Sequence, residues 1–474
     1  MSDQRGNRRD FLKWGVGASA GLGLAGCSTL DRIVLGDQSE DADRIVILGA
    51  GAAGLAAAYQ LKKQNLPYHV YEASARIGGR IYTIPDFFRG QTVAELGAEF
   101  FTGEQKFVLD LAKELRIETT EVAEIETRAR RRRLNQILPL AGANAELKRL
   151  QKSAARAEVV TGLSLADWAK ARSRDAAFTS LISEWSLERY GAAPELIAAE
   201  VFAPAFDRAK NPVSLWTESR YRFRAGSNAL AQAMFDRTAG FQPERTYSFR
   251  HKLIAVRRRS RGLDLVFETP SGQKSVFARH VICALPLAVL KDVDGLIEFS
   301  GPWTNASAFQ VGAHSKFIYS YQERFWGTAL DQSKLIDFGE GQVVWESSYR
   351  LNPLFQFRQG VLSVLWGGEA AKAAGPQHRL AIQRELESLF RKKATGELME
   401  QAMVNWSLQP FAKGSVSYPR PGMGSEWQET SEDWVWAGEH TVGLERGTLQ
   451  GALVSGVRAA EYLIQNRPQR LFPL

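Results

Sequence analysis

A chain of 474 residues, 45% of them hydrophobic, is long enough for two or three domains with a sizeable buried core. The formal net charge is +8, but no stretch resembles a nucleic-acid-binding module, so we predict no nucleic-acid partner. Two cysteines occur, Cys27 and Cys283, and the six histidines lack the spacing of metal ligands. The sequence therefore predicts no metal site, and Cys283, in an apolar run, is a candidate core residue.

The N-terminal stretch predicts a targeting signal. Arg8 and Arg9 form a twin-arginine pair, and the mildly apolar run that follows, 14–25, is too short to span a bilayer, which needs about 20 residues. The run leads into Leu-Ala-Gly before Cys27, which resembles the lipobox of bacterial lipoproteins. We expect a signal peptide over 1–26, a lipid on Cys27, and export in the folded state to the periplasm or another extracytoplasmic space. Cleavage without a lipid, or a flexible tail on a soluble protein, is the alternative.

The next stretch predicts a βαβ unit that binds a dinucleotide. An apolar strand, 44–48, runs into the glycine turn 49–54, a helix follows at 55–64, and a second strand, 68–71, ends on Glu72. Glu72 follows the turn by roughly 20 residues, where an acid takes the ribose hydroxyls in such units. A plain βαβ unit is the alternative, because glycine turns also occur by chance.

The three glycines of the turn have separate roles. Gly49 permits the tight turn, Gly51 lets the backbone approach a pyrophosphate, and Gly54 lets helix and strand pack closely. The first N–H groups of the helix and its dipole then favour the phosphates. These features together predict a phosphate cradle.

The motif from Arg76 to Arg80 indicates which dinucleotide binds. An Arg-x-Gly-Gly-Arg pattern directly behind the ribose-binding acid resembles FAD-binding proteins rather than NAD dehydrogenases. Glycines such as Gly79 let the chain pass close beneath a large ligand, and an arginine neutralises pyrophosphate charge. A basic glycine turn without a ligand is the alternative.

Beyond this unit, helical and strand patterns alternate along the chain. The stretch 107–216 is largely helical, and 253–267 alternates about a basic turn, which predicts a hairpin. Short apolar runs at 317–321, 343–345 and 361–366 predict an antiparallel sheet.

We therefore expect an α/β fold of two domains, with a Rossmann-like FAD-binding domain assembled from three segments and a mixed helical and antiparallel-sheet substrate domain assembled from two. The predicted boundaries are 1–26 for the signal peptide, 27–42 for a lipid-anchored tether, 43–103, 220–300 and 425–474 for the FAD domain, and 104–219 (helical part) and 301–424 (sheet part) for the substrate domain.

Near the C-terminus, a strand runs into a glycine turn and then into a helix. The strand around 434–436 leads to Gly438 and Glu439. In the helix that follows, Gly451 and Gly456 keep one face bare, so we expect a flat ring or a strand to lie against it. The N-terminus of this helix would stabilise negative charge on a reduced flavin.

These stretches together resemble the flavin amine oxidase family, which includes monoamine oxidases, polyamine oxidases and histone demethylases of that type. The similarity extends over nearly all of 43–465, and its most specific parts are 314–326, 406–418 and 436–458. The cofactor contacts that the motifs and the resemblance imply are Gly49, Gly51, Ala53, Gly54, Glu72, Arg76, Gly79, Arg80, Leu96, Gly97, Ala98, Leu253, Trp406, Gly438, Glu439, Thr448 and Leu449.

Within that set, the resemblance implies particular roles. Glu72 would hold the adenosine ribose and Arg80 the pyrophosphate. Leu253 would offer backbone contacts near the adenine, Glu439 would take the ribityl–phosphate region, and Trp406 would lie by the isoalloxazine.

Lys316 is the candidate catalytic residue. It lies in an otherwise apolar strand, 314–319, where a buried lysine needs a partner. In the family, the matching lysine faces flavin N5 through a water and aids reoxidation or deprotonation. The reaction implied is hydride transfer from the carbon next to an amine nitrogen to N5, with O2 or another acceptor reoxidising the flavin. An edge-strand lysine that points to solvent is the alternative.

Several positions depart from the family pattern. Ser74 stands where many relatives have an arginine, and Ser415 stands at the flavin-linking cysteine of covalent members, so we expect non-covalent FAD. The candidate substrate contacts are Val416, Tyr418 and Thr448. Val416 and Thr448 replace the two aromatic rings that hold the amine in amine-oxidising members, and Tyr418 and Trp406 are candidates to compensate.

The same departures keep three functions open. A small-molecule amine is the first expected substrate, and a bulkier one is favoured over a small primary amine. The second function is that of an FAD-dependent dehydrogenase or desaturase acting on a non-amine. The third is that of a non-catalytic flavoprotein at the membrane.

Overall fold

The computed structural model describes most of the chain beyond the N-terminal stretch. The predicted signal peptide, Cys27 and the tether lie outside the described residues. The described residues are 44–87, 92–121, 140–153, 160–210, 212, 215, 220–296, 308–326, 336–337, 342–348, 360–390, 398–423, 433–443 and 445–466. None of the helices in these ranges is long and apolar enough to cross a membrane.

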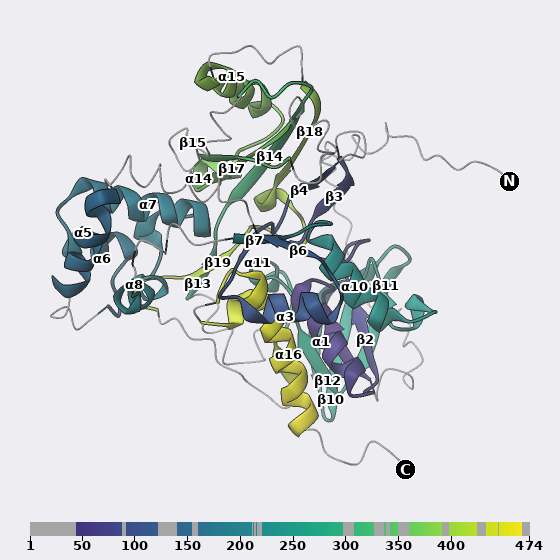
Figure 1. Cartoon of the computed structure of the whole chain (residues 1–474). Coiled ribbons are helices and arrows are strands. Elements are labelled where there is room, and N and C mark those ends of the chain that lie inside the picture. The colour runs from purple at the N-terminus through teal and green to yellow at the C-terminus, as the bar shows by residue number, and fades with distance from the viewer. Residues whose placement is uncertain are drawn as a thin grey trace, which may run out of the picture. The chain divides into compact units, whose positions relative to one another are not determined.

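A five-stranded parallel sheet forms the predicted dinucleotide-binding region (Figure 1). Its strands come from three separated stretches of the chain, as expected for a Rossmann-like domain, although the exact domain boundaries stay predictions. In spatial order the strands are β20 (Trp434–Trp436), β12 (His280–Cys283), β1 (Ile45–Leu48), β2 (Tyr68–Tyr71) and β8 (Tyr247–Ser248).

The first helix begins earlier than the sequence pattern predicts. Helix α1 spans Ala52–Lys63 rather than 55–64, because Gly51 is already its N-cap residue. Gly54 therefore lies inside the first turn of the helix. A Cβ there would overlap the Gly49 carbonyl oxygen and approach the Ile47 side chain at 3.4 Å, so the predicted close packing of helix and strand is confirmed.

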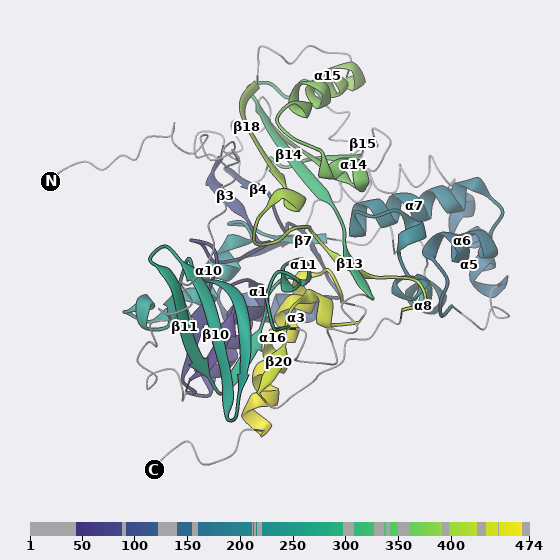
Figure 2. The same ribbon diagram turned by 180° about the vertical axis from the view of Figure 1, so that it is seen from behind.

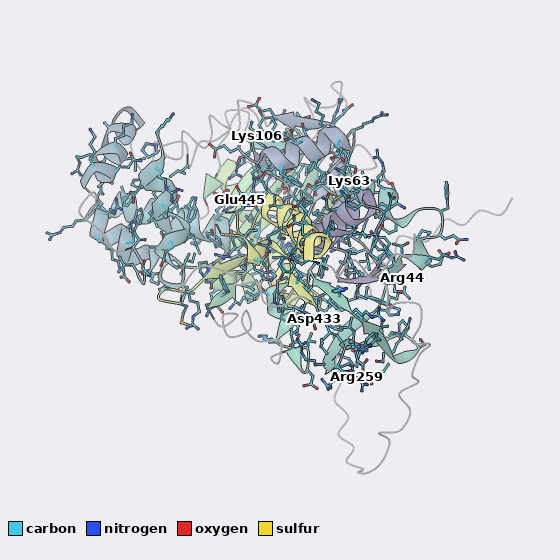
Figure 3. The ribbon with its side chains drawn as sticks, turned by 90° about the horizontal axis from the view of Figure 1, so that it is seen from below. Arg44, Lys63, Lys106, Arg259, Asp433 and Glu445 are labelled. Carbon is cyan, nitrogen blue, oxygen red and sulfur yellow. The ribbon has the colours of Figure 1, made fainter. Side chains whose placement is uncertain are left out.

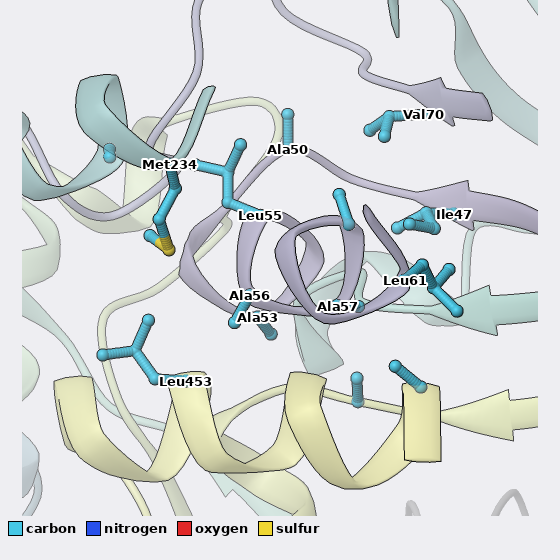
Figure 4. Close-up of a cluster of buried hydrophobic side chains, with 14 of the residues drawn as sticks. Ile47, Ala50, Ala53, Leu55, Ala56, Ala57, Leu61, Val70, Met234 and Leu453 are labelled. Atoms are coloured by element: carbon cyan, nitrogen blue, oxygen red, sulfur yellow. The ribbon is translucent and has the colours of Figure 1, made fainter. Parts of the chain in front are cut away.

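Helix α1 is packed against the last helix of the chain, α16 (Leu449–Asn466). Figure 4 shows Ala53 and Ala56 on the side of α1 that faces α16, with Leu453 opposite them. A Cβ at Gly456 would overlap the Ala53 carbonyl oxygen. At Gly456 the expectation of a ring or strand is therefore wrong: there α16 meets α1, which comes close because it presents alanines. A Cβ at Gly451 would instead overlap the Glu445 carbonyl oxygen.

The predicted hairpin at 253–267 is confirmed and belongs to a three-stranded antiparallel sheet. Its strands are β9 (Lys252–Arg259), β10 (Gly262–Thr269) and β11 (Gly272–Ala278). The arginines near the turn pair with acids: Arg257 with Asp294, Arg258 with Asp433, and Arg259 with Asp264. Figure 3 shows Arg259 at the outer end of this sheet. The described basic residues here form a solvated, charge-paired edge.

The helical lobe contains α5 (Leu140–Ser153), α6 (Leu165–Arg172), α7 (Ala176–Tyr190) and α8 (Ala203–Arg208). Its core is aromatic, with the Trp168 ring 5.5 Å from the Phe202 ring and 5.6 Å from the Phe206 ring, both edge to face. Because α7 ends at Gly191 in the left-handed conformation, its last residue, Tyr190, is placed at the inner end of the lobe.

A second five-stranded sheet, antiparallel throughout, confirms the sheet predicted from the runs at 317–321, 343–345 and 361–366 (Figures 1 and 2). Strand β14 lies inside it, between β17 and β18, and all eight of its residues are buried. In spatial order the strands are β15 (Ile336–Asp337), β16 (Gln342–Glu346), β17 (Gly360–Gly367), β14 (His314–Tyr321) and β18 (Leu398–Asn405).

Short elements connect these regions. The turn that follows β4 (Thr92–Glu95) leads to β5 (Phe101–Thr102), which pairs with β7 (Arg220–Phe223). Strand β19 (Ser417–Pro419) pairs with β13 (Phe309–Val311), and a 3-10 helix, η7 (Trp406–Leu408), follows β18. These connections bring the ends of β14, α7 and α16 to one cavity.

Candidate active site

A cavity of about 1310 Å³ joins the glycine turn to the inner side of strand β14. Every predicted FAD contact lines it except Gly54, whose role is to let α1 pack on β1. Lys316, Val416 and Thr448 line it as well. Tyr418 is not among its lining residues: its ring is buried in the core of the helical lobe, and its hydroxyl donates to Gln310 at 2.9 Å.

The glycine turn leaves the cavity open where a pyrophosphate is expected. Gly49 has φ +98° and its N–H donates to the Tyr71 carbonyl at 2.7 Å. A Cβ at Gly51 would meet nothing nearer than the Gly79 Cα, at 4.0 Å, so the space beside it is free of described atoms. Gly51 also caps α1 without a side-chain hydrogen bond. These features fit a dinucleotide phosphate at the helix N-terminus.

Glu72 directly follows β2, and its carboxylate links the glycine turn to the loop after β2. Its carboxylate accepts hydrogen bonds from the N–H groups of Ala50, at 2.7 Å, and Ser74, at 2.8 Å. Ser74, the first departure from the family pattern, completes the turn by bonding both the N–H and the carbonyl of Arg76. Glu72 therefore lines the cavity in a fixed position, as a ribose-binding acid requires.

The two arginines of the Arg-x-Gly-Gly-Arg motif have different partners. Arg76 donates to the carbonyls of Ile77, Gly79 and Ile81, so its guanidinium holds the loop in shape, and burial lowers its pKa. Arg80 reaches across the cavity wall and donates to the Ser415 carbonyl at 2.5 Å. Arg80 lines the cavity and is a candidate contact for the expected pyrophosphate.

Glu439 is the buried acid that receives Arg80. Its carboxylate accepts from Arg80 at 2.8 Å, from the Ser417 hydroxyl at 2.6 Å and from the Gly447 N–H at 2.9 Å. Burial by itself would raise the pKa of Glu439, but the charges of Arg80 and His440 and the hydrogen bonds from Ser417 and Arg80 together outweigh burial, and the pKa lies below its ordinary value. The Glu439 carboxylate thus joins the loop that carries Arg80, strand β19 and the turn before α16.

Lys316 lies on the interior strand β14 and is 3% exposed, which rules out the alternative of a solvent-facing edge-strand lysine. Its ammonium forms an ion pair with Glu99. The Trp345 ring lies 4.9 Å from Lys316 Nζ, and the indole N–H donates to Glu99 at 3.1 Å. All three residues line the cavity.

Glu99 and Tyr190 are candidate functional residues that the sequence patterns missed. The stretch 95–101 carries two acids, Glu95 and Glu99, and nothing in their spacing indicates which of them would meet a lysine. Tyr190 is buried and lines the cavity beside Val416: a Cβ at Gly447 would touch both the Val416 side chain and, at 3.9 Å, the Tyr190 ring. An aromatic ring is therefore present next to the position where Val416 replaces one.

Thr448 has a structural role in the site. Its hydroxyl accepts from the Gly451 N–H at 2.8 Å, which satisfies one of the free N–H groups at the start of α16. Trp406 is held by its indole N–H, which donates to the Leu96 carbonyl at 3.2 Å. Both side chains therefore face the cavity in fixed positions.

Ser415 is hydrogen-bonded on two sides. Its hydroxyl bonds His314 Nδ1 at 2.8 Å and the Gly312 carbonyl at 2.9 Å. Burial lowers the pKa of His314, which favours its neutral form. Within the part of the chain that the structure describes, no group of three or more His, Cys, Asp or Glu side chains is placed to hold a metal ion.

Comparison with known proteins decides the family. The family model described as flavin containing amine oxidoreductase matches residues 52–464. The chain belongs to this family. Its members bind a flavin, and the cavity described above fits FAD, so the protein is an FAD-dependent oxidoreductase of the α/β fold expected from its sequence.

Two curated relatives are histone demethylases by name. "Lysine-specific histone demethylase 1 homolog 2" from Oryza sativa subsp. japonica is 26% identical, over 90% of this chain and 58% of the relative. Human "Lysine-specific histone demethylase 2" is 22% identical, over 88% of this chain and 53% of the relative. The chain thus spans about half the length of these curated relatives.

A solved structure shares the fold over almost its whole length. Cyclohexylamine oxidase from Brevibacterium oxydans IH-35A superposes with a TM-score of 0.69 at 19% identity, covering 90% of this chain and 99% of that one. This similarity confirms the predicted fold class for the family member described here.

Proposed function

We propose that this flavin amine oxidase family member oxidises an amine by transfer of hydride from the carbon next to the nitrogen to FAD. The observation that carries the proposal is the continuous cavity, which is lined by the glycine turn, the buried Lys316 and the aromatic side chains of Tyr190 and Trp345. FAD supplies the hydride acceptor when it is bound. The chain positions and orients the cofactor and the substrate and excludes water from them.

The residues that line the cavity would contact different parts of the cofactor and the substrate. The glycine turn, Glu72 and Arg80 would hold the adenine dinucleotide part, because they present bare backbone, an acid for the ribose and a cation for the phosphates. Trp406, Thr448 and Lys316 would surround the ring part. The aromatic surface at Tyr190 and Trp345 would receive the substrate.

The main contribution of the aromatic surface at Tyr190 and Trp345 to the proposed reaction is to exclude water from the substrate. The amine must lose its proton before hydride transfer so that its lone pair can stabilise the developing iminium, and a desolvated aromatic site favours the neutral amine. Water then hydrolyses the imine to a carbonyl product and either ammonia, from a primary amine, or a smaller amine. O2 or another acceptor takes the electrons.

We propose non-covalent FAD because Ser415 offers a hydroxyl that is already bonded to His314 and Gly312. Acid precipitation of the purified yellow protein tests this. All of the flavin should remain in the supernatant, whereas a yellow pellet would contradict it.

Anaerobic mixing of the purified protein with polyamines, aromatic amines and methylated amines tests the proposed reaction. Cyclohexylamine belongs in this set because of the structural neighbour. The expected result is bleaching of the flavin band by at least one amine. Val416 favours the second function, a dehydrogenase or desaturase, because the aromatic pair is incomplete. Bleaching by a non-amine alone would support that function, and no bleaching by any small molecule would support a non-catalytic flavoprotein.

We also propose export by the twin-arginine route and lipid anchoring at Cys27, supported by the motif at residues 8–9 and the Leu-Ala-Gly-Cys sequence. Expression in a bacterial host tests both. Replacing Arg8 and Arg9 by lysine should retain the protein in the cytoplasm, and Cys27→Ser should release it from the membrane fraction. Unchanged fractionation of both variants would contradict the proposal.

A further inference from the structure

The ion pair of Lys316 and Glu99 is enclosed on the wall of the cavity. Each side chain is 4% exposed. Trp345 covers both partners, since its ring lies 4.9 Å from the ammonium and its N–H donates to the carboxylate. The Phe100 ring, 5.9 Å from that of Trp345, extends this apolar cover. In such surroundings a charge acts more strongly on its neighbours than it does in water.

Three acids near this pair have partners of their own. Glu346, on the same strand as Trp345, accepts from Arg324 at 2.6 Å. Glu188 pairs with Arg220 at 3.0 Å. Glu95, which interacts electrostatically with both Glu99 and Lys316, is held by hydrogen bonds from Ser227 and Thr83 behind the cavity wall. The net charge that Lys316 presents to the cavity is therefore decided by Glu99.

We propose that Glu99 is a positioning residue that cancels the charge of Lys316 beside the flavin and so slows reaction with dioxygen. The inference rests on the proposed placement of FAD against Lys316. Reduction of O2 to H2O2 takes two electrons and two protons, and transfer of the first electron produces the superoxide anion. A neighbouring cation stabilises that negative charge, whereas a neutral ion pair stabilises it much less.

Four proteins form a charge series for the test. The pair carries no net charge in the wild type, +1 in Glu99→Gln, −1 in Lys316→Met, and none in the double variant. Each FAD-loaded protein is reduced anaerobically with dithionite, without an amine, and mixed with O2 while the flavin absorbance is followed. Glu99→Gln should be reoxidised roughly tenfold or more faster than the wild type. Lys316→Met should be slower, and the double variant should match the wild type.

Two further measurements report the net charge of the Lys316–Glu99 pair in the absence of any catalysed reaction. Glu99→Gln should bind the anion sulfite more tightly, read from loss of the flavin band, and should have a more positive flavin midpoint potential. Lys316→Met should shift both in the opposite direction, and the double variant should restore both. A purely structural role of Glu99 would not produce opposite shifts that cancel. Glu99→Asp, which keeps the charge, is the matched control and should stay near the wild type.

A folded, FAD-loaded Glu99→Gln protein that reacts with O2 no faster than the wild type would overturn the inference. If that variant does not fold, the two neutral forms decide: equal rates in the wild type and the double variant support the inference, and a double variant tenfold slower overturns it. Because no amine is used, failure of amine oxidation and failure of this inference are separate results.

Discussion

The dinucleotide region and the β14 wall of the cavity are built on different physical principles. Around the glycine turn, backbone approaches backbone: a Cβ at Gly54 or Gly97 would overlap a carbonyl oxygen, and the groups that matter are N–H donors and empty space. On the β14 wall, charged side chains meet inside an apolar cover. Added atoms in the first region should therefore cost either stability or cofactor binding, and the second region should tolerate changes of shape better than changes of charge.

The largest expected effect tests the first half of this comparison. Gly54→Ala places a methyl group on the Gly49 carbonyl and should destabilise the protein by about 3 kcal/mol or more, because backbone cannot move aside cheaply. Thermal unfolding of the apoprotein measures this. Gly51→Ala should leave the unfolding temperature nearly unchanged yet weaken FAD binding, since its Cβ meets only empty space.

Gly443→Ala is the matched control for both glycine variants, because a Cβ there meets nothing within 4 Å. It should alter neither stability nor FAD content. Equal losses of stability in Gly54→Ala and Gly51→Ala would show that the two glycines do not have separate roles.

The second prediction concerns Glu95, the last residue of β4. Burial, and next the nearby Glu99 charge, raise the pKa of Glu95 from 4.5 to about 7. A raised folded-state pKa gives stability that is present below pH 4.5 and lost as the pH rises through about 7. Glu95→Gln, which keeps the acceptor for the Ser227 N–H, should therefore be more stable than the wild type at pH 8 by about 3 kcal/mol.

Thermal unfolding of the wild type and Glu95→Gln across pH 4 to 8 provides the measurement. The two curves should converge at the acidic end and separate above neutrality. A constant difference across the range would mean that Glu95 keeps an ordinary pKa in the folded protein.

The third prediction sharpens the comparison where the two regions meet. Arg80→Met removes the charge that lowers the pKa of Glu439, and it leaves the carboxylate with Ser417 and Gly447. The cost should be about 2 kcal/mol, less than for a fully buried pair because the Arg80 side chain is 26% exposed. Denaturant unfolding at pH 7 measures it, and Arg80→Lys should recover part of the loss.

Acid titration gives the sign of the Glu439 contribution. Because its folded-state pKa is depressed, its stabilisation is present at neutral pH and is lost as the pH falls through that pKa. The difference between the wild type and Arg80→Met should therefore shrink toward acid pH, and a difference that grew would contradict the assignment.

The smallest expected effect is at the surface. Arg224 and Glu118 form an ion pair at 3.0 Å, but both side chains are mostly exposed. Arg224→Ala should change the free energy of unfolding by less than about 0.5 kcal/mol. A larger loss in the same unfolding assay would show that charge matters outside the apolar cover as much as inside it.

The difference between the dinucleotide region and the β14 wall also explains which features could be predicted from the sequence. The strand, glycine turn, helix and acid of the dinucleotide unit lie within 44–72, so local spacing predicted them. The structure confirms the elements, although α1 begins at Ala52 rather than at 55 and two other ends differ by one residue. The antiparallel sheet was likewise predicted from three apolar runs. Both predictions depend on periodicity, which is a local property.

The side-chain partners could not be predicted in this way. Glu99 and Lys316 are 217 positions apart, and only the folded chain brings their charges together. Tyr190 is the last residue of α7, and the sequence pattern of that helix does not indicate that its end lines a cavity. The bare face of α16 was predicted correctly from Gly456 but assigned to the wrong neighbour, since composition does not say which surface an exposed glycine face will meet.

The contact between α1 and α16 has a consequence for biosynthesis. The alanine face of α1 is covered by α16, a late segment of the chain, and residues 448–449 of the cavity come from the same segment. At ribosomal rates of about 5 to 20 residues per second, α1 waits on the order of 20 to 80 s for this cover. The complete cavity therefore forms only after this segment has been synthesised, and until then the alanine face of α1 lacks its partner helix.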